Sequence, residues 1–434
     1  MHSRRILAGM CSVGTTLAGQ LHFISEEICL RSPLSPSQCR LSGPDGFHHG
    51  LMQSTHDIGG STAAPPFSWD FKPRCVTASD PEDDEPYCLY SSHSFAGGRG
   101  ISIVTTPDRI ESILQMSAFA QSNSSHDLNT QATPPFEERE LPGRGRGLIA
   151  NKTVLRGDRL FAYTPVLLLD DEAYEALSEE EWIDLETAAV EQLPAATRAE
   201  FWKLYGQPLG NPVSDRINTN AFEIETADGT YYGVFPEIAR LNHDCRPNAA
   251  YFFDQQSFTH YVHVVTTVAP GTELTITYVD PHMSRSQRRR QLSSSWGFEC
   301  SCSLCTAHPS LGQESDSRLK QINALNEKLE KSSALGSSDA ARALISLYEQ
   351  ERIHAAASTA HRFAAKAFCA EGRRWETIAH ARLATELTML DEGFHDEEVG
   401  AMRRLAEEPH TQSCWPGVAP PNATIEAAWA GNFL

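Results

Sequence analysis

Four cysteines constrain the fold of this chain more than any other feature of its sequence. Cys300, Cys302 and Cys305 form a C-x-C-x-x-C run, and Cys245 lies far upstream of it. Three thiols so close together can chelate one metal ion. A distant fourth thiolate then completes a tetrahedral site, the arrangement that zinc favours where its role is structural. Ordinary buried cysteines are the alternative, but scattered burial does not explain this spacing. We therefore predict a structural zinc site.

Four sequence blocks accompany these cysteines. They are GRGRGL at 143–148, NHDCRPN at 242–248, GTELTITY at 271–278 and WGFEC at 296–300. In this order and spacing they resemble the SET-domain protein lysine methyltransferases with a post-SET zinc segment, most of all the SET-and-MYND branch and the related fungal SET proteins. The likeness extends from about Pro135 to Thr306. No cysteine stands between Cys88 and Cys245, so we expect a helical insertion in place of that branch's MYND module.

The resemblance implies that the chain binds S-adenosyl-L-methionine. The residues expected to contact this cofactor are Arg144, Gly145, Arg146, Asn242, His243, Tyr278 and Phe298. Glycine lacks a β-carbon, so the backbone around Arg144 and Arg146 can approach a ligand closely. Phe298 is expected to stack on the adenine ring. Without the family context, the glycines would indicate a tight turn and His243 a histidine of the core.

Tyr278 is the predicted catalytic residue, because the family's tyrosine at this place lies where the lysine channel meets the methyl group. A phenol with a pKa near 10 stays protonated at neutral pH, so it orients the lysine amine rather than deprotonating it. The cationic sulfonium itself lowers the pKa of the lysine by like-charge repulsion. Trp296 lines the same predicted channel, where several relatives have tyrosine. An indole donates one hydrogen bond and accepts none, which leaves the channel shape and the number of methyl groups open.

The predicted fold class is α+β, a SET β-clip of short strands with a helical insertion, a post-SET zinc site and an all-α C-terminal region. The predicted organisation is a signal-like segment at 1–19, a loosely structured module at 20–133, a SET domain at 134–282 with its insertion at about 170–230, a post-SET segment at 283–308, and a tetratricopeptide-like helical region at 316–410. Apolar residues three and four apart predict the C-terminal helices. Within the N-terminal module only 87–90 and 100–105 are typical of strands, and 108–120 of a short helix.

The charge of the chain restricts its partners. Its net charge is −20, from 36 basic and 56 acidic side chains. Such a surface repels phosphate backbones and argues against direct nucleic-acid binding. It suits a lysine-bearing protein or peptide, histone or non-histone. The basic run Arg285, Arg288, Arg289 and Arg290 is interpreted as a helix face beside the active site. No apolar stretch reaches 18 residues, so we predict no membrane span. We expect a monomer.

The N-terminus leaves the compartment open. Arg4 and Arg5 precede an apolar stretch and small residues at 18–19, the order of a secretory signal, although Gly, Ser and Thr dilute the apolar part. In an oxidising compartment four further cysteines would form two disulfides, and in the cytosol they would be free thiols. These cysteines are Cys29, Cys39, Cys75 and Cys88, and glycosylation sequons begin at Asn123, Asn151 and Asn422. The cofactor and the clustered thiolates favour the nucleus or cytoplasm.

Three hypotheses for function remain from the sequence. The leading one is an S-adenosylmethionine-dependent protein-lysine N-methyltransferase. The second is a catalytically inert SET scaffold that acts through its helical region, which the tryptophan at 296 allows. The third is an exported binding protein that retains the fold.

Overall fold

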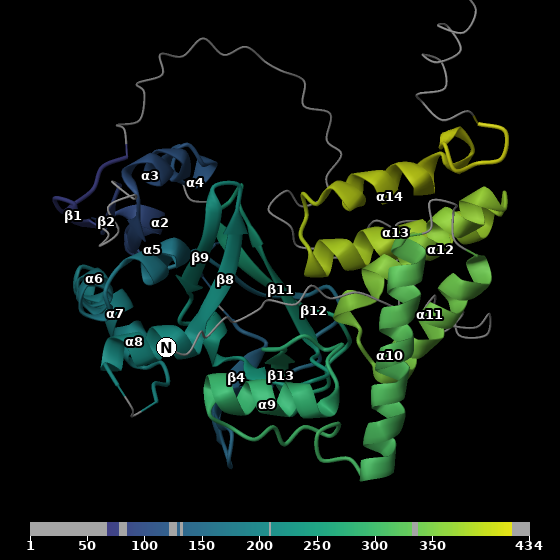
Figure 1. The fold of residues 1–434 in the computed structure, drawn as a ribbon, viewed down its shortest axis with the longest axis horizontal. Helices are drawn as coiled ribbons and strands as arrows, with labels where there is room; N and C mark the ends of the chain where they lie inside the picture. The colour runs from purple at the N-terminus through teal and green to yellow at the C-terminus, as the bar shows by residue number, and fades with distance from the viewer. Residues whose placement is uncertain are drawn as a thin grey trace, which may run out of the picture.

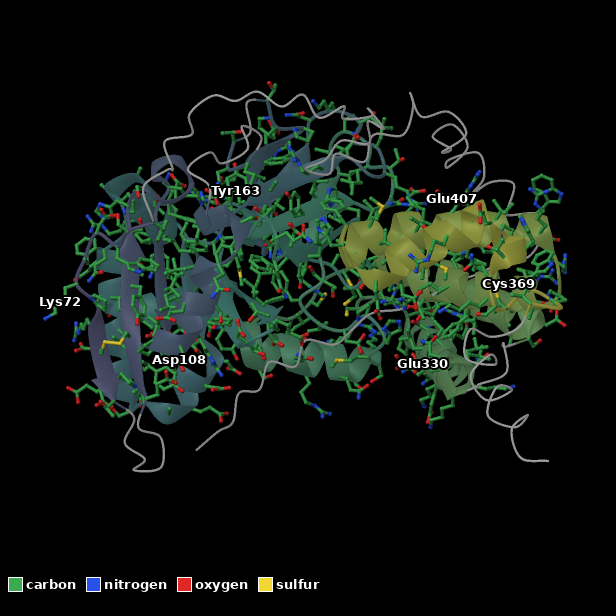
Figure 2. The ribbon with its side chains drawn as sticks, turned by 90° about the horizontal axis from the view of Figure 1, so that it is seen from above. Lys72, Asp108, Tyr163, Glu330, Cys369 and Glu407 are labelled. Atoms are coloured by element: carbon green, nitrogen blue, oxygen red, sulfur yellow. A yellow bond between two sulfur atoms is a disulfide. The ribbon has the colours of Figure 1, made fainter. Side chains whose placement is uncertain are left out.

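Three small sheets and a C-terminal array of helices make up the protein (Figure 1). The computed structural model describes residues 67–77, 85–120, 128–130, 133–207, 210–331 and 337–418. The predicted α+β class with a helical C-terminal region is confirmed. The signal-like segment, Cys29, Cys39, Asn123 and Asn422 lie outside the described residues. Seen from above, Lys72 and Cys369 lie at opposite ends of the molecule (Figure 2).

A six-stranded sheet forms one end of the molecule, with the strand order β1-β2-β3-β7-β9-β8. Its strands are β1 (Arg74–Thr77), β2 (Pro86–Ser92), β3 (Ile101–Thr105), β7 (Leu167–Asp170), β8 (Ala221–Thr226) and β9 (Gly229–Val234). Beside β2 and β3 lie α2 (Phe95–Gly98), α3 (Pro107–Leu114) and α4 (Ser117–Ala120). The strands and the helix expected at 87–90, 100–105 and 108–120 are therefore present in outline.

The prediction of a loosely structured module at 20–133 is wrong for residues 86–114. Strand β3 runs parallel to β7, with Ser102 opposite Leu167, so these residues are an integral part of the sheet. All five residues of β3 are buried. Ile101 and Ile103 belong to the main hydrophobic core, and Val104 belongs to the core cluster that includes helix α6. In the β1–β2 pair Cys75 lies opposite Cys88, and the two form a disulfide. The sequence had left the state of these two cysteines open.

The helical insertion covers one face of this sheet. It consists of α5 (Asp171–Ala176), α6 (Glu179–Glu191), α7 (Ala195–Trp202) and α8 (Pro212–Asn220). Helix α6 begins at the predicted capping box of Ser178 and Glu181, and its buried face, with Leu185 and Ala189, packs against the strands. The helices end at Asn220 rather than near 230, because residues 221–234 form the β8–β9 hairpin.

The other two sheets bring three of the four sequence blocks together. The four-stranded sheet has the order β10-β13-β5-β4, and the three-stranded sheet has the order β11-β12-β6. Their strands are β4 (Phe136–Leu141), β5 (Gly145–Ala150), β6 (Arg159–Tyr163), β10 (Asn242–His243), β11 (Ala249–Asp254), β12 (Thr259–Val264) and β13 (Glu273–Ile276), with the 3-10 turn η1 (Ile238–Arg240) before β10. Strand β10 pairs in parallel with β13, which in turn pairs with β5. The blocks at 143–148, 242–248 and 271–278 are therefore neighbours in one sheet.

Helices continue from the last sheet to the end of the described chain. They are α9 (Arg285–Trp296), α10 (Pro309–Lys331), α11 (Ser338–Glu351), α12 (Ser358–Ala370), α13 (Arg374–Asp391) and α14 (Glu397–Glu407), with the 3-10 turns η2 (Ala355–Ala357) and η3 (Pro409–Thr411). From α10 to α14 each helix packs on the next, and α13 also contacts β11. Helix α10 begins before the predicted 316. Cys369 and Cys414 form a disulfide. In the described part of the chain, no helix combines the length and the apolar character that crossing a membrane requires.

Candidate active site and metal centre

The four predicted metal ligands converge at one buried point. The Sγ atoms of Cys245, Cys300, Cys302 and Cys305 all lie within 4.8 Å of one another. The Cys245 sulfur is 3.9 Å from that of Cys300 and 3.5 Å from that of Cys305. Four sulfurs about 2.3 Å from a tetrahedral zinc are separated by about 3.8 Å. The sulfur–sulfur distances and the ligand type of the cluster are therefore compatible with zinc.

Arg288 supplies an independent reason to place an anionic centre here. Its side chain is fully buried, and its Nε and Nη2 have no hydrogen-bond partner among the described residues. Burial by itself lowers the pKa of Arg288, but the charge on the sulfurs of Cys245, Cys305 and Cys302 raises it overall. The Nη1 of Arg288 donates to the Met283 carbonyl oxygen, but a buried cation is costly without an anionic partner. Four thiolates around one divalent ion would carry a net negative charge. The buried cation therefore fits a metal-loaded cluster.

His243 lies between the metal cluster and Tyr278. Its Nδ1 accepts the backbone N–H of Tyr278 at 3.0 Å, and its Nε2 is 3.3 Å from the Sγ of Cys245. Burial lowers the pKa of His243 to about 3, so the ring is neutral at physiological pH. The alternative that His243 is a satisfied core histidine agrees with its burial. Its partners, however, belong to two of the four sequence blocks.

The Tyr278 hydroxyl is fixed by the backbone. It donates to the carbonyl oxygen of Leu241 at 2.7 Å. Burial raises the pKa of Tyr278, so the phenol remains protonated at neutral pH. Because its one proton is used on Leu241, the oxygen lone pairs remain available to accept an N–H from another group.

Two aromatic side chains at the C-terminal end of helix α9, Trp296 within it and Phe298 just after it, complete the surroundings of Tyr278. The ring centroid of Trp296 is 5.3 Å from that of Tyr278, and the Phe298 ring is 6.4 Å from Tyr278 at an interplanar angle of 85°. The indole N–H of Trp296 donates to the Thr219 carbonyl oxygen at 3.2 Å, which orients the ring. Gly297 between them has a φ of 72°, a left-handed conformation that ends α9 and turns the chain toward the cysteines.

The glycine-rich block lies on the other side of Asn242. Gly143 and Gly145 have φ values of 72° and 68°, and a β-carbon built on either meets open space, so a ligand can approach this backbone closely. At Gly147, by contrast, a β-carbon would lie 2.8 Å from Asn242 Nδ2. The close packing there lets Asn242 donate to the Arg146 carbonyl oxygen at 3.1 Å. An open backbone bordered by half-buried polar side chains is compatible with a bound cofactor.

Glu273 fixes the remaining polar side chains of this site. It accepts from Asn242 Nδ2 at 2.8 Å and pairs with Arg144 Nε at 3.1 Å. The Nη2 of Arg144 also donates to the carbonyl oxygen of His243 at 3.0 Å. Arg146 differs from Arg144, because its side chain is largely exposed and pairs with surface carboxylates of β4. Of the predicted contact residues, Arg146 is therefore placed to act through its backbone.

Arg288 and Glu273 were missed as site residues in the sequence. Arg288 and its basic neighbours were interpreted as a helix face beside the active site, and the helix is present, but Arg288 is buried in it. The signal that distinguishes it is spacing, since Arg288 lies four residues before the fully buried Leu292 and so shares its face. Glu273 lies within the block at 271–278, but no local pattern shows that its carboxylate joins Asn242 to Arg144.

Known proteins match both the domain and the wider chain. The profile of the SET domain matches residues 145–279. Histone-lysine N-methyltransferase set5 of Schizosaccharomyces pombe is 27% identical over 296 residues, which are 67% of this chain and 89% of set5. Histone-lysine N-methyltransferase SMYD3 of Homo sapiens is 36% identical over 92 residues, 21% of each chain. N-lysine methyltransferase SMYD2 of Homo sapiens is 30% identical over 117 residues, 25% of this chain and 27% of SMYD2.

Residues 145–279 therefore match a SET domain. Cys245 of the buried cysteine cluster lies within this domain, and Cys300, Cys302 and Cys305 follow it. The chain therefore contains a SET domain and is similar to the lysine methyltransferases set5, SMYD3 and SMYD2, in line with its sequence blocks. The likeness extends over most of set5 but over only 21% and 27% of the two SMYD proteins.

Proposed function

We propose that this protein transfers a methyl group from S-adenosylmethionine to a lysine side chain of a protein, with Tyr278 as the catalytic residue. The observation that carries the proposal is the position of Tyr278. Its hydroxyl donates to Leu241, its backbone is held by His243, and Trp296 and Phe298 stand beside it. The rings of Tyr278 and Trp296 provide a surface for the apolar stem of a lysine.

The proposed role of the Tyr278 hydroxyl follows from its hydrogen bond. Because the proton points to Leu241, the oxygen accepts an N–H from the lysine amine and turns the nitrogen lone pair in a defined direction. The raised pKa of Tyr278 excludes the phenolate as a base at neutral pH. Positioning of this kind is the main help that a protein can give to a methyl transfer. The bound cofactor supplies the electrophilic methyl group on a sulfonium.

The proposed cofactor contacts are the backbone of 143–146, which is open at Gly143 and Gly145, and the residues Asn242, His243, Tyr278 and Phe298. Glu273 holds Arg144 and Asn242 in place before any ligand arrives. Zinc on the four cysteines would fix residues 296–305 over Tyr278, so metal binding contributes directly to the folding of this segment.

The proposed substrate is a lysine in a basic protein segment, with histones as the first class to test. The net charge of −20 supports a cationic partner, and the set5 and SMYD3 relatives are named as histone-lysine methyltransferases. The amine must lose its proton before it attacks, and a nearby positive sulfonium favours this loss by like-charge repulsion.

A labelled-methyl assay tests the proposal with two tyrosine variants. Purified wild type, loaded with zinc under reducing conditions, is incubated with labelled cofactor and either core histones or a cell lysate. Tyr278→Phe is expected to lower methyl transfer at least about 100-fold, since the amine loses its orienting acceptor. Tyr174→Phe is the matched control, because this tyrosine is 51% exposed on α5, and it should leave the rate unchanged.

The same assay separates the proposal from the inert-scaffold alternative. Cofactor binding by the wild type without label transfer to any protein would favour the scaffold. Absence of cofactor binding under these conditions would contradict the proposed function itself.

A further inference from the structure

His243 connects two groups that the proposed function treats separately, the metal centre and the catalytic tyrosine. The ring is 3% exposed. Its centroid lies 5.4 Å from the ring of Tyr278 and 6.3 Å from that of Phe298. Both ring nitrogens are engaged, Nδ1 by the backbone of Tyr278 and Nε2 by the sulfur of Cys245.

We propose that His243 is a positioning residue that transmits the order of the metal centre to Tyr278 through these two hydrogen bonds. This inference rests on the proposed function for its catalytic consequence. Its structural content, a histidine that couples a thiolate to a backbone amide, does not depend on that function.

The hydrogen bond from Tyr278 determines which ring nitrogen carries the proton. The backbone N–H of Tyr278 points at Nδ1, so Nδ1 offers its lone pair and cannot carry a hydrogen. A neutral imidazole has one N–H, which must then be on Nε2 and directed at the Cys245 sulfur. A metal-bound thiolate accepts this N–H more strongly than a neutral thiol does, because the thiolate sulfur carries negative charge. Such bonds to metal ligands commonly orient the ligand and tune the site.

The strand pairing explains why Tyr278 needs this partner. The parallel pairing of β10 with β13 ends at His243 opposite Ile276. Tyr278 lies two residues beyond the end of β13, where the ladder no longer supplies an acceptor for its N–H. The imidazole of His243 takes the place of that missing acceptor. The direction of the Tyr278 side chain therefore depends on the angle of the imidazole, and this angle depends on Cys245.

Two substitutions of His243 each keep one of its two hydrogen bonds and remove the other. His243→Asn places an amide oxygen near the position of Nδ1, so it can still accept from Tyr278 but does not reach Cys245. His243→Gln places an amide N–H near the position of Nε2, so it can still donate to Cys245 but has no acceptor at Nδ1. Both remove the ring and its packing, which makes each variant the control for the other.

The first readout is the rate at which bound zinc is lost to an excess of a chelating dye. His243→Asn is expected to release zinc about 10- to 100-fold faster than wild type, the usual effect of removing a partner of a metal ligand. His243→Gln should stay within about threefold of wild type, because it keeps a donor to the thiolate.

The second readout is hydrogen exchange at the Tyr278 amide, measured at single-residue resolution on zinc-loaded protein. His243→Gln is expected to speed this exchange about tenfold, the effect of losing one hydrogen bond. His243→Asn should keep most of the protection. In the methyl-transfer assay, His243→Gln should lower kcat more than it raises KM for a lysine peptide, since Tyr278 is misplaced.

The inference is contradicted if the two variants do not differ from each other in these two readouts. If both variants lose zinc at the same rate and expose Tyr278 equally, or if neither changes either quantity, His243 has only a packing role. A wild type that transfers no methyl group, while the two variants still divide zinc release from amide exchange, contradicts the proposed function and leaves the coupling standing.

Discussion

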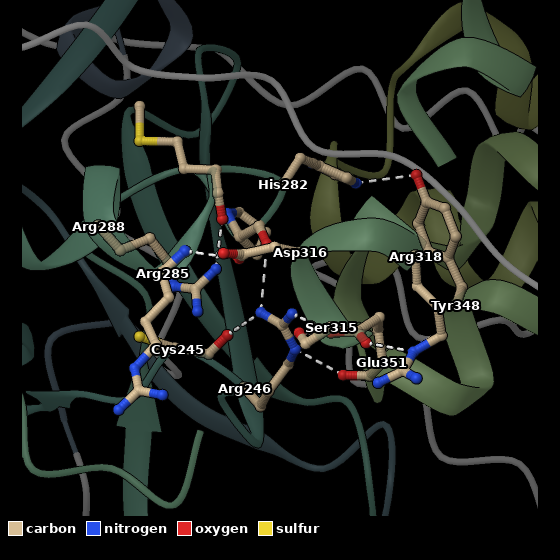
Figure 3. A network of polar contacts seen from close by, with 12 residues as sticks. Cys245, Arg246, His282, Arg285, Arg288, Ser315, Asp316, Arg318, Tyr348 and Glu351 are labelled. Carbon is tan, nitrogen blue, oxygen red and sulfur yellow. Dashed lines mark hydrogen bonds and ion pairs between the residues drawn. The ribbon is translucent and has the colours of Figure 1, made fainter. Parts of the chain in front are cut away.

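Arg246 joins residues 242–248, the segment that contains the predicted zinc ligand Cys245, to the C-terminal helices through a buried ion pair (Figure 3). Its Nη2 lies 2.6 Å from Oε2 of Glu351, at the end of α11, and the side chains are 3% and 1% exposed. Arg246 also donates to the backbone carbonyl oxygens of Cys245 and Pro281. Arg246, which directly follows the predicted metal ligand Cys245, is thus fixed to helix α11, although Glu351 lies 105 residues further along the chain.

We predict that Glu351→Gln strongly destabilises the protein. The carboxylate of Glu351 also accepts from Ser315 and pairs with Arg318, each at 2.7 Å. The amide keeps the shape of the side chain but leaves two guanidiniums facing a neutral group, one of them fully desolvated. Breaking a buried ion pair in this way costs about 3–5 kcal/mol. The retained hydrogen bonds favour the lower end, about 3 kcal/mol.

Thermal unfolding at pH 7, followed by circular dichroism, measures this effect. A loss of about 3 kcal/mol should lower the Tm by at least about 5 °C if the helices and the SET domain unfold together. Glu327→Gln is the matched control, since Glu327 forms an exposed pair with Lys331 on α10, and exposed pairs contribute little. Equal melting of Glu351→Gln and wild type would refute the reasoning.

The pH dependence supplies a second test of the same pair. Burial by itself would raise the pKa of Glu351, but hydrogen bonds from Ser315 and Arg246 and the charge of Arg246 lower it overall. A carboxylate with a depressed pKa in the folded state stabilises the protein above its unfolded pKa of about 4.3, and this stability is lost as the pH falls through the folded value. The Tm difference between wild type and Glu351→Gln should therefore be constant from pH 7 to 5 and shrink below about pH 4.

Three further perturbations test the metal centre and the surroundings of Tyr278. Cys305→Ser should lower the zinc content measured by metal analysis and expose residues 296–305 to proteolysis, because three thiolates leave the site open. Arg288→Met should speed zinc release to a chelator about tenfold, whereas Arg289→Met, which removes an exposed pair on the same helix, should not change it. Trp296→Phe removes the donor to Thr219 and should slow methylation of a lysine peptide about fivefold, with the methyl count of the product read by mass spectrometry.

The residues of the candidate site were largely predictable because their chemistry is local. The spacing of the three thiols at 300–305 indicates a metal site. Cys245 is the cysteine of the block at 242–248, which made it the candidate for the fourth ligand. The resemblance of their blocks to the SET-domain family implied that Tyr278, Trp296 and Phe298 lie near one another, and the structure brings their rings together. The capping box at Ser178 likewise fixed the start of a helix from four adjacent residues.

The sheet of the N-terminal strands was not predictable, because its determinants are distant. Strands β2 and β3 were expected individually, but nothing in 86–105 indicates that β3 pairs in parallel with β7 rather than standing in a separate module. The Arg246–Glu351 pair was hidden for the same reason, since each residue alone is typical of a solvated surface. Two charged side chains reveal their burial only when the helices that cover them are in place.

Three arginines around residues 242–248 show how an acidic protein keeps positive charge inside. Arg144 pairs with Glu273, Arg246 with Glu351, and Arg288 lies beside the thiolate cluster. Each cation thus has an anionic partner from a different segment, and each pair restrains a different side of residues 242–248. These contacts hold residues 242–248 from three directions, so the carbonyls and the histidine of the segment are ordered before a ligand arrives. The cost of that order is met in folding and not in each catalytic cycle, which is why damage to any of the three pairs should affect both stability and turnover.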